Sequence, residues 1–222
     1  MASEAALGPG GGIRSALLVD WGGVLTTNLF TSFSAFCTDN GIEPDALARR
    51  FRSDREGRDL LIAFEEGRIE EAHFEERFAA LLEVSHTGLI DGLFARVGPD
   101  EAMLAAVRAA RTAGIRTGLV SNSWGTRRYD RALLAELFDG VVISGEVGMR
   151  KPAPEIYALG AERAGAAPET CVFVDDLPFN LPPAEALGMA TVHHLDTAET
   201  VEALERLLGV ELAGAGGART AG

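Results

Sequence analysis

Five polar side chains in this sequence stand where they could do chemistry together. Asp20 ends the apolar run LLV, and the Gly22–Gly23 turn that follows would hold its carboxylate above a sheet. Such a carboxylate can attack phosphorus or carbon and form a covalent intermediate. Ser121 ends a second apolar run, in LVSNS, where its hydroxyl and the Asn122 amide could bind phosphate oxygens. Each feature alone also fits ordinary turn chemistry, so only their combination indicates a site.

The other three residues are a lysine and two adjacent acids. Lys151 stands in GMRKP at the expected start of a helix, where its cation could offset repulsion between carboxylates and an anionic substrate. Asp175 and Asp176 end the apolar run VFV and would repel each other if uncompensated. A hard divalent cation such as Mg²⁺ takes oxygen ligands and removes that penalty. A solvated lysine and solvated turn acids are the alternative interpretations.

The elements that would position these residues alternate between strand and helix. Short apolar runs predict strands, and three-to-four-residue apolar spacing predicts helices between them. This order predicts a parallel sheet with right-handed crossovers, whose ligand site lies at the carboxyl ends of the strands. The expected strands are 16–19, 115–121, 141–144, 171–174 and 190–194, and the expected helices of the second half are 100–113, 130–138, 153–164, 183–187 and 198–208.

A long helical segment interrupts this alternation. Between the first and second strands the sequence contains only helical spacing, punctuated by glycines. We therefore expect a helical insertion at 28–98 and an α/β core formed by 13–27 and 99–212. The Gly-rich ends, 1–12 and 213–222, are expected to be a disordered N-terminus and a flexible tail.

In this order, the motifs resemble those of the haloacid dehalogenase (HAD) superfamily. The resemblance rests on LLVDWGGVL, LVSNS, GMRKPAPEIY and FVDDLPFN, and it extends over about 13–210. It implies an α/β fold, a Rossmann-like parallel sheet with helices on both faces, plus a small helical cap that closes over the site and selects substrates. It also implies a hydrolase that uses Mg²⁺ and acts on a small phosphorylated metabolite.

The resemblance implies a role for each matching residue. Asp20 would be the nucleophile and a metal ligand, Ser121 would hold the phosphoryl group, and Lys151 would steady both. Asp176 would be a direct magnesium ligand, and Asp175 would act through water or orient its neighbour. Asn122 and Trp21 are further candidates for substrate contact, although Trp21 also fits packing beneath the cap. Asn180 is expected to brace the metal loop, His193 to be a packed strand residue, and Arg127 and Arg128 to be solvated loop residues.

One position departs from the family pattern. Phosphatases of this family carry a second Asp two residues after the nucleophile, where this chain has Gly22. In the family that Asp protonates the leaving oxygen and then activates water, while its backbone carbonyl binds the metal. Gly22 keeps the carbonyl, so metal binding is expected to survive without general acid–base help. Such help contributes roughly 10²–10⁴-fold to the rate.

The composition limits the classes of partner. A net charge of −13 disfavours nucleic acid and anionic membranes. Cys37 and Cys171 form no disulfide or metal-binding pattern, no apolar run reaches membrane-spanning length, and the N-terminus has no signal-peptide pattern. We therefore expect a cytoplasmic enzyme with a small-molecule substrate, while the sequence carries no information on oligomeric state.

Two other functions remain open. In a dehalogenase Asp20 would attack carbon, and the dehalogenases of this family also lack the second Asp. They need no magnesium, however, so the Asp175–Asp176 pair would have no purpose there. A non-catalytic member that binds phosphate or a partner protein is the second alternative, against which the intact Asp20, Lys151 and Asp176 argue.

Overall fold

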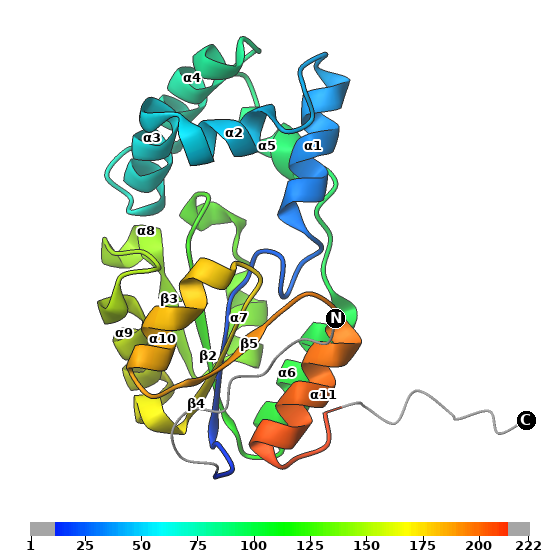
Figure 1. Ribbon diagram of the computed structural model, residues 1–222, viewed down its shortest axis with the longest axis vertical. Helices are drawn as coiled ribbons and strands as arrows, with labels where there is room; N and C mark the ends of the chain where they lie inside the picture. The colour runs from blue at the N-terminus through cyan, green and yellow to red at the C-terminus, as the bar shows by residue number, and fades with distance from the viewer. Residues whose placement is uncertain (1–11, 213–222) are drawn as a thin grey trace, which may run out of the picture.

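A five-stranded parallel sheet forms the centre of the protein (Figure 1). The computed structural model describes residues 12–212, so the expectations for the two ends of the chain fall outside it except at Gly12. Its strand order is β3-β2-β1-β4-β5, and every pairing is parallel. The strands are β1 (Ala16–Val19), β2 (Arg116–Ser121), β3 (Gly140–Ile143), β4 (Cys171–Asp175) and β5 (Ala190–His193).

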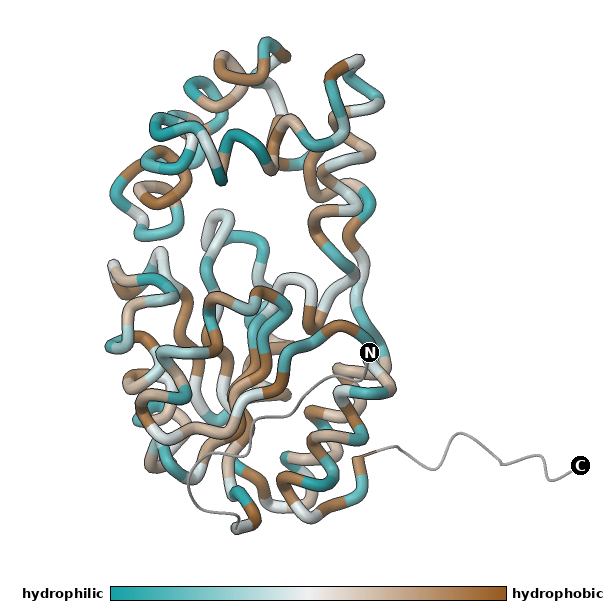
Figure 2. The backbone as a smooth tube through the Cα atoms, viewed as in Figure 1, coloured by the Kyte–Doolittle hydropathy of each residue, from teal (hydrophilic) through white to brown (hydrophobic). Residues whose placement is uncertain are grey.

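Helices cover both faces of this sheet, which confirms the predicted Rossmann-like α/β class. Successive side chains of a strand point to opposite faces, so Leu17 and Val19 pack with α6, α7 and α11, whereas Ala16 and Leu18 pack with α9 and α10. Figure 2 shows hydrophobic and hydrophilic residues alternating along these helices. Their bounds are α6 (Glu101–Thr112), α7 (Arg131–Leu137), α9 (Pro154–Ala164), α10 (Leu181–Ala186) and α11 (Thr197–Leu208).

The first five of the six helices between β1 and β2 form a separate layer over the carboxyl end of the sheet (Figure 1). They pack around their own aromatic cluster, in which Phe74 and Phe78 are fully buried and lie four residues apart on one helix. None of the five strands comes from this segment. The helices are α1 (Leu29–Asp39), α2 (Ala46–Ser53), α3 (Arg55–Glu65), α4 (Glu71–Leu82) and α5 (Leu89–Phe94).

The two chain crossings into and out of this helical layer run side by side. Thr26 and Pro99 form an isolated antiparallel bridge. Thr27 donates its backbone N–H to Gly98 O at 2.8 Å, and Asp100 donates to Leu25 O at 3.0 Å. The layer is therefore joined to the sheet through one paired two-stranded neck.

Two local features differ from the sequence-based expectation. The chain turns at Ser144 into a short helix, α8 (Ser144–Val147), so β3 ends at Ile143 and not at Ser144. Helix α10 begins two residues earlier than expected, because Pro182 and Pro183 fit in a first helical turn, whose N–H groups have no intrahelical partner. Both cysteines are buried and free. No helix among residues 12–212 is long and apolar enough to cross a membrane.

Candidate active site

The carboxyl ends of three neighbouring strands bring the predicted site residues together. Asp20 directly follows β1, Ser121 ends β2, and Asp175 ends β4. Lys151 joins them from the loop before α9. All four side chains are buried, with Lys151 and Asp175 at 0% exposure. Parallel pairing of β1 with both β2 and β4 places these strand ends at one edge, as the strand order requires.

Lys151 lies at the centre of this group. Its Nζ donates to Asp175 Oδ2 at 2.6 Å and lies 2.9 Å from Asp20 Oδ1. Burial would lower the pKa of Lys151, but the two carboxylates outweigh burial and raise it, so the amine stays charged. The Asn122 side chain fixes the Lys151 backbone, because it accepts from Lys151 N at 2.8 Å and donates to Lys151 O at 3.1 Å. Asn122 thus positions Lys151, and its contact with phosphate stays a prediction.

Three carboxylates meet around that lysine. Oxygens of Asp20, Asp175 and Asp176 lie within 4.8 Å of one another. Burial is the main cause of the raised pKa of Asp20, at about 6, and of Asp176, at about 8; the Asp175 charge raises both further. When all three groups are ionised, one ammonium against two buried carboxylates and one half-buried carboxylate leaves negative charge uncompensated. A compact set of hard oxygen donors with excess negative charge fits Mg²⁺.

The two strand-four acids differ in their surroundings. Asp175 Oδ1 accepts from Leu177 N and from Asn180 Nδ2, both at 2.9 Å, while its Oδ2 accepts from Lys151. The predicted bracing contact of Asn180 is therefore present. Asp176 is half-buried, and its carboxylate lies so close to Gly23 that a Cβ there would meet Oδ2 at 2.4 Å. With φ at +78° as well, position 23 admits glycine only.

Gly22 has no such backbone restriction, because its φ is not left-handed. A Cβ at this position would instead meet Leu29 Cδ1 at 2.7 Å. Leu29 is the first residue of α1, and its methyl group thus fills the space next to Gly22. An apolar side chain from the helical layer therefore lies where a side chain at position 22 would begin.

A cavity of about 450 Å³ opens beside these residues. Trp21, Gly22 and Ser121 line its end near the carboxylates. Tyr129 also lines it: the Tyr129 hydroxyl lies 2.9 Å from Ser121 Oγ, and its ring packs against Trp21 with 5.6 Å between centroids. Tyr129 lies in the loop after β2, eight residues beyond Ser121, and no motif of the sequence pointed to it.

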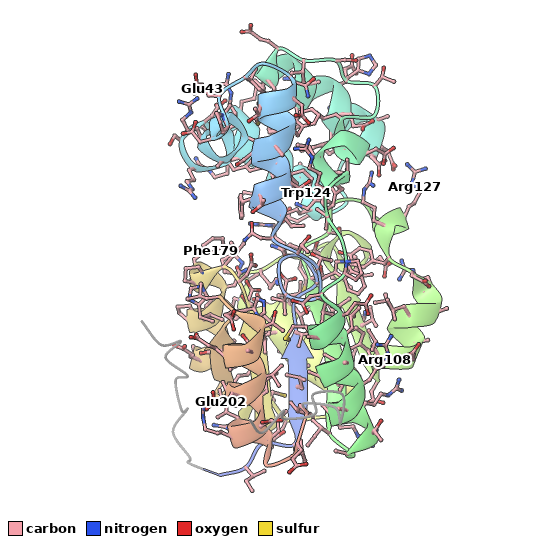
Figure 3. The ribbon with its side chains drawn as sticks, turned by 90° about the vertical axis from the view of Figure 1, so that its right-hand side faces the viewer. Glu43, Arg108, Trp124, Arg127, Phe179 and Glu202 are labelled. Carbon is pink, nitrogen blue, oxygen red and sulfur yellow. The ribbon has the colours of Figure 1, made fainter. Side chains whose placement is uncertain are left out.

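The expectation of a solvated loop residue holds for Arg127, whose side chain is 81% exposed, but it is wrong for Arg128, which packs against the helical layer. Arg127 Nη2 donates to Glu71 of α4 at 2.9 Å, and Arg128 Nη2 donates to Asp91 of α5 at 2.8 Å. The Arg128 guanidinium also lies 5.4 Å from the Phe94 ring centre. The loop after β2 therefore contacts the helical layer, and Figure 3 shows Trp124 of this loop at the junction of the two parts. Sequence periodicity could not show these contacts, because they depend on the path of an irregular loop.

His193 lies beside the metal-compatible carboxylates, as a half-buried residue at the end of β5. Its Nε2 is 3.1 Å from the backbone oxygen of Asp176. It therefore packs in the strand, as expected, and also contacts the loop that carries Asp176.

Glu65 is a second residue that the sequence did not single out. It ends α3, is 5% exposed, and forms an ion pair with Arg150, the neighbour of Lys151. The Ser144 hydroxyl donates to the Glu65 backbone oxygen. The helical layer is thus fixed to the core directly beside the site. Burial raises the pKa of Glu65 to about 7, although Arg150 and Lys151 oppose the shift; Asp20 adds to it.

This shift predicts a pH-dependent stability. Because the pKa of Glu65 is higher in the folded than in the unfolded protein, folding takes up a proton between about pH 4.5 and 7. The Glu65 contribution to the free energy of unfolding therefore falls as pH rises through this range. Glu65→Gln removes that loss, and we expect the variant to gain on the order of 1–3 kcal/mol relative to wild type between pH 4.5 and pH 8.

Urea denaturation of both proteins across this pH range measures the difference. Glu66→Gln is the matched control, since Glu66 is the next residue and pairs with the exposed Arg68. Parallel pH curves for wild type and Glu65→Gln would show that the Glu65 carboxyl titrates as in the unfolded chain.

Comparison with known proteins agrees with this architecture. The model of the haloacid dehalogenase-like hydrolase family matches residues 15–188, so the chain belongs to this family and is a HAD-type hydrolase. Bifunctional epoxide hydrolase 2 of Rattus norvegicus is 36% identical over 116 residues, which are 49% of this chain and 21% of that protein. Glyceraldehyde 3-phosphate phosphatase of Methanopyrus kandleri is 31% identical over 106 residues, 46% of each chain.

Solved structures show the same fold. A HAD family enzyme from Bacteroides thetaiotaomicron, a mutant in complex with magnesium and inorganic phosphate, is 25% identical, with a TM-score of 0.60. The match covers 81% of this chain and 93% of that chain. The chain spans about a fifth of the length of the first curated relatives it matches, so the activity of those whole proteins does not transfer to it.

Proposed function

We propose that this hydrolase is a magnesium-dependent phosphatase of small phosphate monoesters with Asp20 as its nucleophile. The observation that carries the proposal is the group of Asp20, Asp175 and Asp176 oxygens within 4.8 Å of one another, with Lys151 Nζ 2.9 Å from Asp20. This group borders the cavity through Trp21 and Gly22. A buried nucleophile, a cation and a set of hard oxygen ligands beside a cavity are the parts that phosphoryl transfer needs.

Each residue has one task in the reaction. An Asp20 carboxylate oxygen attacks phosphorus, and the bond from phosphorus to the leaving oxygen breaks, giving an aspartyl-phosphate and an alkoxide or phenolate. That oxygen takes its proton from water, because Gly22 offers none. Water then attacks phosphorus, the Asp20–phosphorus bond breaks, and inorganic phosphate leaves while the carboxylate is restored. Ser121, positioned by Tyr129, donates to a phosphate oxygen throughout.

Charge compensation is the task of the remaining groups. Lys151 neutralises charge on Asp20 and on the phosphoryl oxygens. The side-chain amide of Asn122 holds the Lys151 backbone in place. Asp20, Asp176 and the Gly22 carbonyl would hold Mg²⁺, which when bound neutralises the transferring phosphoryl group. Asp175 has both oxygens engaged by Lys151, Leu177 and Asn180, so it orients the site.

The helical layer at 28–98 is proposed to be the cap. It has its own core, it joins the sheet through the neck of Thr26 and Pro99, and it contributes Leu29 and Phe94 to the cavity wall. Its closed position is supported by the pairs of Arg128 with Asp91 and of Arg150 with Glu65. Closure over the site would exclude water from the phosphoryl group.

Phosphatase activity is favoured over dehalogenation by Asp176. A dehalogenase has no use for a carboxylate beside Asp20 and Asp175, because the group would only add repulsion. The similarity to a glyceraldehyde 3-phosphate phosphatase and to an enzyme solved with magnesium and phosphate points the same way. A screen of phosphate monoesters and 2-haloacids, each with and without Mg²⁺, tests the choice. Halide release without metal, or no turnover at all, would contradict the proposal.

The two strand-four acids should respond differently to replacement. Asp176→Ala is expected to weaken magnesium binding by more than about 100-fold, whereas Asp175→Ala weakens it by roughly tenfold. Asp175→Ala should instead destabilise the fold by about 3 kcal/mol, because Lys151 loses a buried partner. Calorimetric magnesium titration and urea denaturation of both variants measure the two effects. Weaker binding in Asp175→Ala than in Asp176→Ala would reverse the ligand assignment.

A further inference from the structure

The leaving-group side of the cavity is apolar. Beside Gly22, the Leu29 methyl group occupies the space that a side chain at position 22 would enter. Beyond it, the aromatic residues Trp21, Tyr129, Trp124 and Phe94 line the wall. The volume of about 450 Å³ lies within the roughly 300–1,000 Å³ range of small-molecule sites. An occupant attached to the phosphorus would therefore lie against hydrocarbon.

Thr26 and Asn122 of the wall are already engaged, whereas Arg128 keeps one buried donor, its Nε, without a hydrogen-bond partner. Thr26 Oγ1 accepts from Gly23 N at 3.0 Å and donates to Thr27 O at 3.1 Å. The Asn122 amide is bound to both backbone groups of Lys151, as described above. A body with several hydroxyls would therefore find fewer partners here than it loses in water, which is unfavourable for each hydroxyl left without one.

The cations of the wall are also neutralised. Arg127 pairs with Glu71, and Arg128 pairs with Asp91 at 2.8 Å and stacks on Phe94. Among residues 12–212, no Asp or Glu lines the cavity. Each arginine of the wall is thus paired with an acid outside the cavity lining, which weakens its attraction for a second phosphate, and the lining has no acid to bind an amine.

We propose that the substrates are phosphate monoesters with an uncharged, apolar body, aromatic or of similar ring size, and that Leu29 is a specificity-determining residue for them. This proposal rests on the phosphatase function above. Leu29 selects because a hydroxylated body would meet its methyl groups without gaining a hydrogen bond. Leu29, in the first turn of the helical layer, therefore contacts the leaving group of the substrate. Gly22 has no side chain with which to contact it.

A matched pair of esters tests the substrate class. Cyclohexylmethyl phosphate and glucose 6-phosphate both carry a six-membered ring on a primary alcohol, and they differ in the hydroxyls. We expect kcat/KM to be at least roughly 100-fold higher for cyclohexylmethyl phosphate. The electron-withdrawing hydroxyls make the sugar the better leaving group, so this bias works against the expected result. Equal rates, or a preference for the sugar phosphate, would overturn the proposal.

Variants of Leu29 test the residue. Leu29→Asn, which has the same branching and the same number of side-chain heavy atoms, should reduce the preference for cyclohexylmethyl phosphate at least about tenfold. Leu195→Asn is the matched control, because Leu195 is 64% exposed and lies outside the cavity wall. An unchanged preference in Leu29→Asn, or an equal loss in both variants, would refute the role of Leu29.

Phosphonates cannot be hydrolysed, so their binding tests the apolar site independently of phosphatase activity. In the presence of Mg²⁺, benzylphosphonate should bind wild type at least about tenfold more tightly than methylphosphonate, measured by calorimetry. Leu29→Asn should lose most of that difference. Tight benzylphosphonate binding without hydrolysis of any ester would contradict the phosphatase function alone, whereas hydrolysis with equal phosphonate affinities would contradict the apolar site alone.

Discussion

Asp20→Asn is expected to reduce kcat for any phosphate ester by at least about 10⁴-fold, since a variant without its nucleophile keeps only binding and electrostatic contributions. The carboxamide keeps the shape of the side chain but not its charge. Lys151 retains its 2.6 Å contact with Asp175, so the site should stay folded. Steady-state kinetics of purified protein, with circular dichroism to verify the fold, measure the effect.

The matched control for this variant is Asp39→Asn. Asp39 also carries an ion pair, with Arg96 at 2.8 Å, but its side chain is 57% exposed and lies at the end of α1. We expect wild-type kinetics from this control. Activity of Asp20→Asn close to that of Asp39→Asn would remove Asp20 from the mechanism.

The leaving oxygen of the substrate has no proton donor at position 22. Wild type should hydrolyse aryl and acyl phosphates far faster than alkyl phosphates, because Gly22 provides no acid and the oxygen must depart as an anion. Gly22→Asp should flatten this dependence and raise alkyl phosphate turnover by up to about 10²-fold, the lower end of what general acid–base catalysis contributes. The φ of Gly22 permits the change.

Leu29 limits how much of that gain appears. Its Cδ1 lies 2.7 Å from the Cβ position of residue 22, so the leucine must move in the single variant. Leu29→Ala combined with Gly22→Asp should therefore exceed Gly22→Asp alone on alkyl phosphates. A series of esters with graded leaving-group pKa, measured for wild type and both variants, gives the slopes. A shallow slope in wild type would mean that another group supplies the proton, and His193, 3.1 Å from the Asp176 carbonyl, is the first to test.

Strand ends were predictable because one physical rule places them. Short apolar runs indicated the strands, and parallel pairing puts every carboxyl end at one edge. Asp20, Ser121 and Asp175 therefore come together whatever the loops do. The position of Lys151 near these strand ends could be predicted for a related reason, since Lys151 stands just before a helix that packs on the same sheet.

Residues outside that rule could not be predicted. Tyr129 reaches Ser121 through the path of an irregular loop, and Glu65 reaches Arg150 only after the helical layer folds onto the core. Leu29 beside Gly22 is a contact between the first turn of a helix and a glycine without a side chain, so neither residue type marks it. Apolar spacing identified the helices of the layer, but it does not reveal which of their side chains face the sheet.

The aspartyl-phosphate on Asp20 can be trapped chemically, which tests the proposed nucleophile at the atom where it reacts. Enzyme turning over phenyl phosphate with Mg²⁺ is quenched with borohydride, which reduces an acyl phosphate to an alcohol, and peptide mass spectrometry locates the reduced residue. We expect reduction at Asp20, dependent on Mg²⁺ and absent in Asp20→Asn. Steady hydrolysis of phenyl phosphate with no reduced residue at Asp20, or with the reduced residue elsewhere, would contradict the proposed nucleophile.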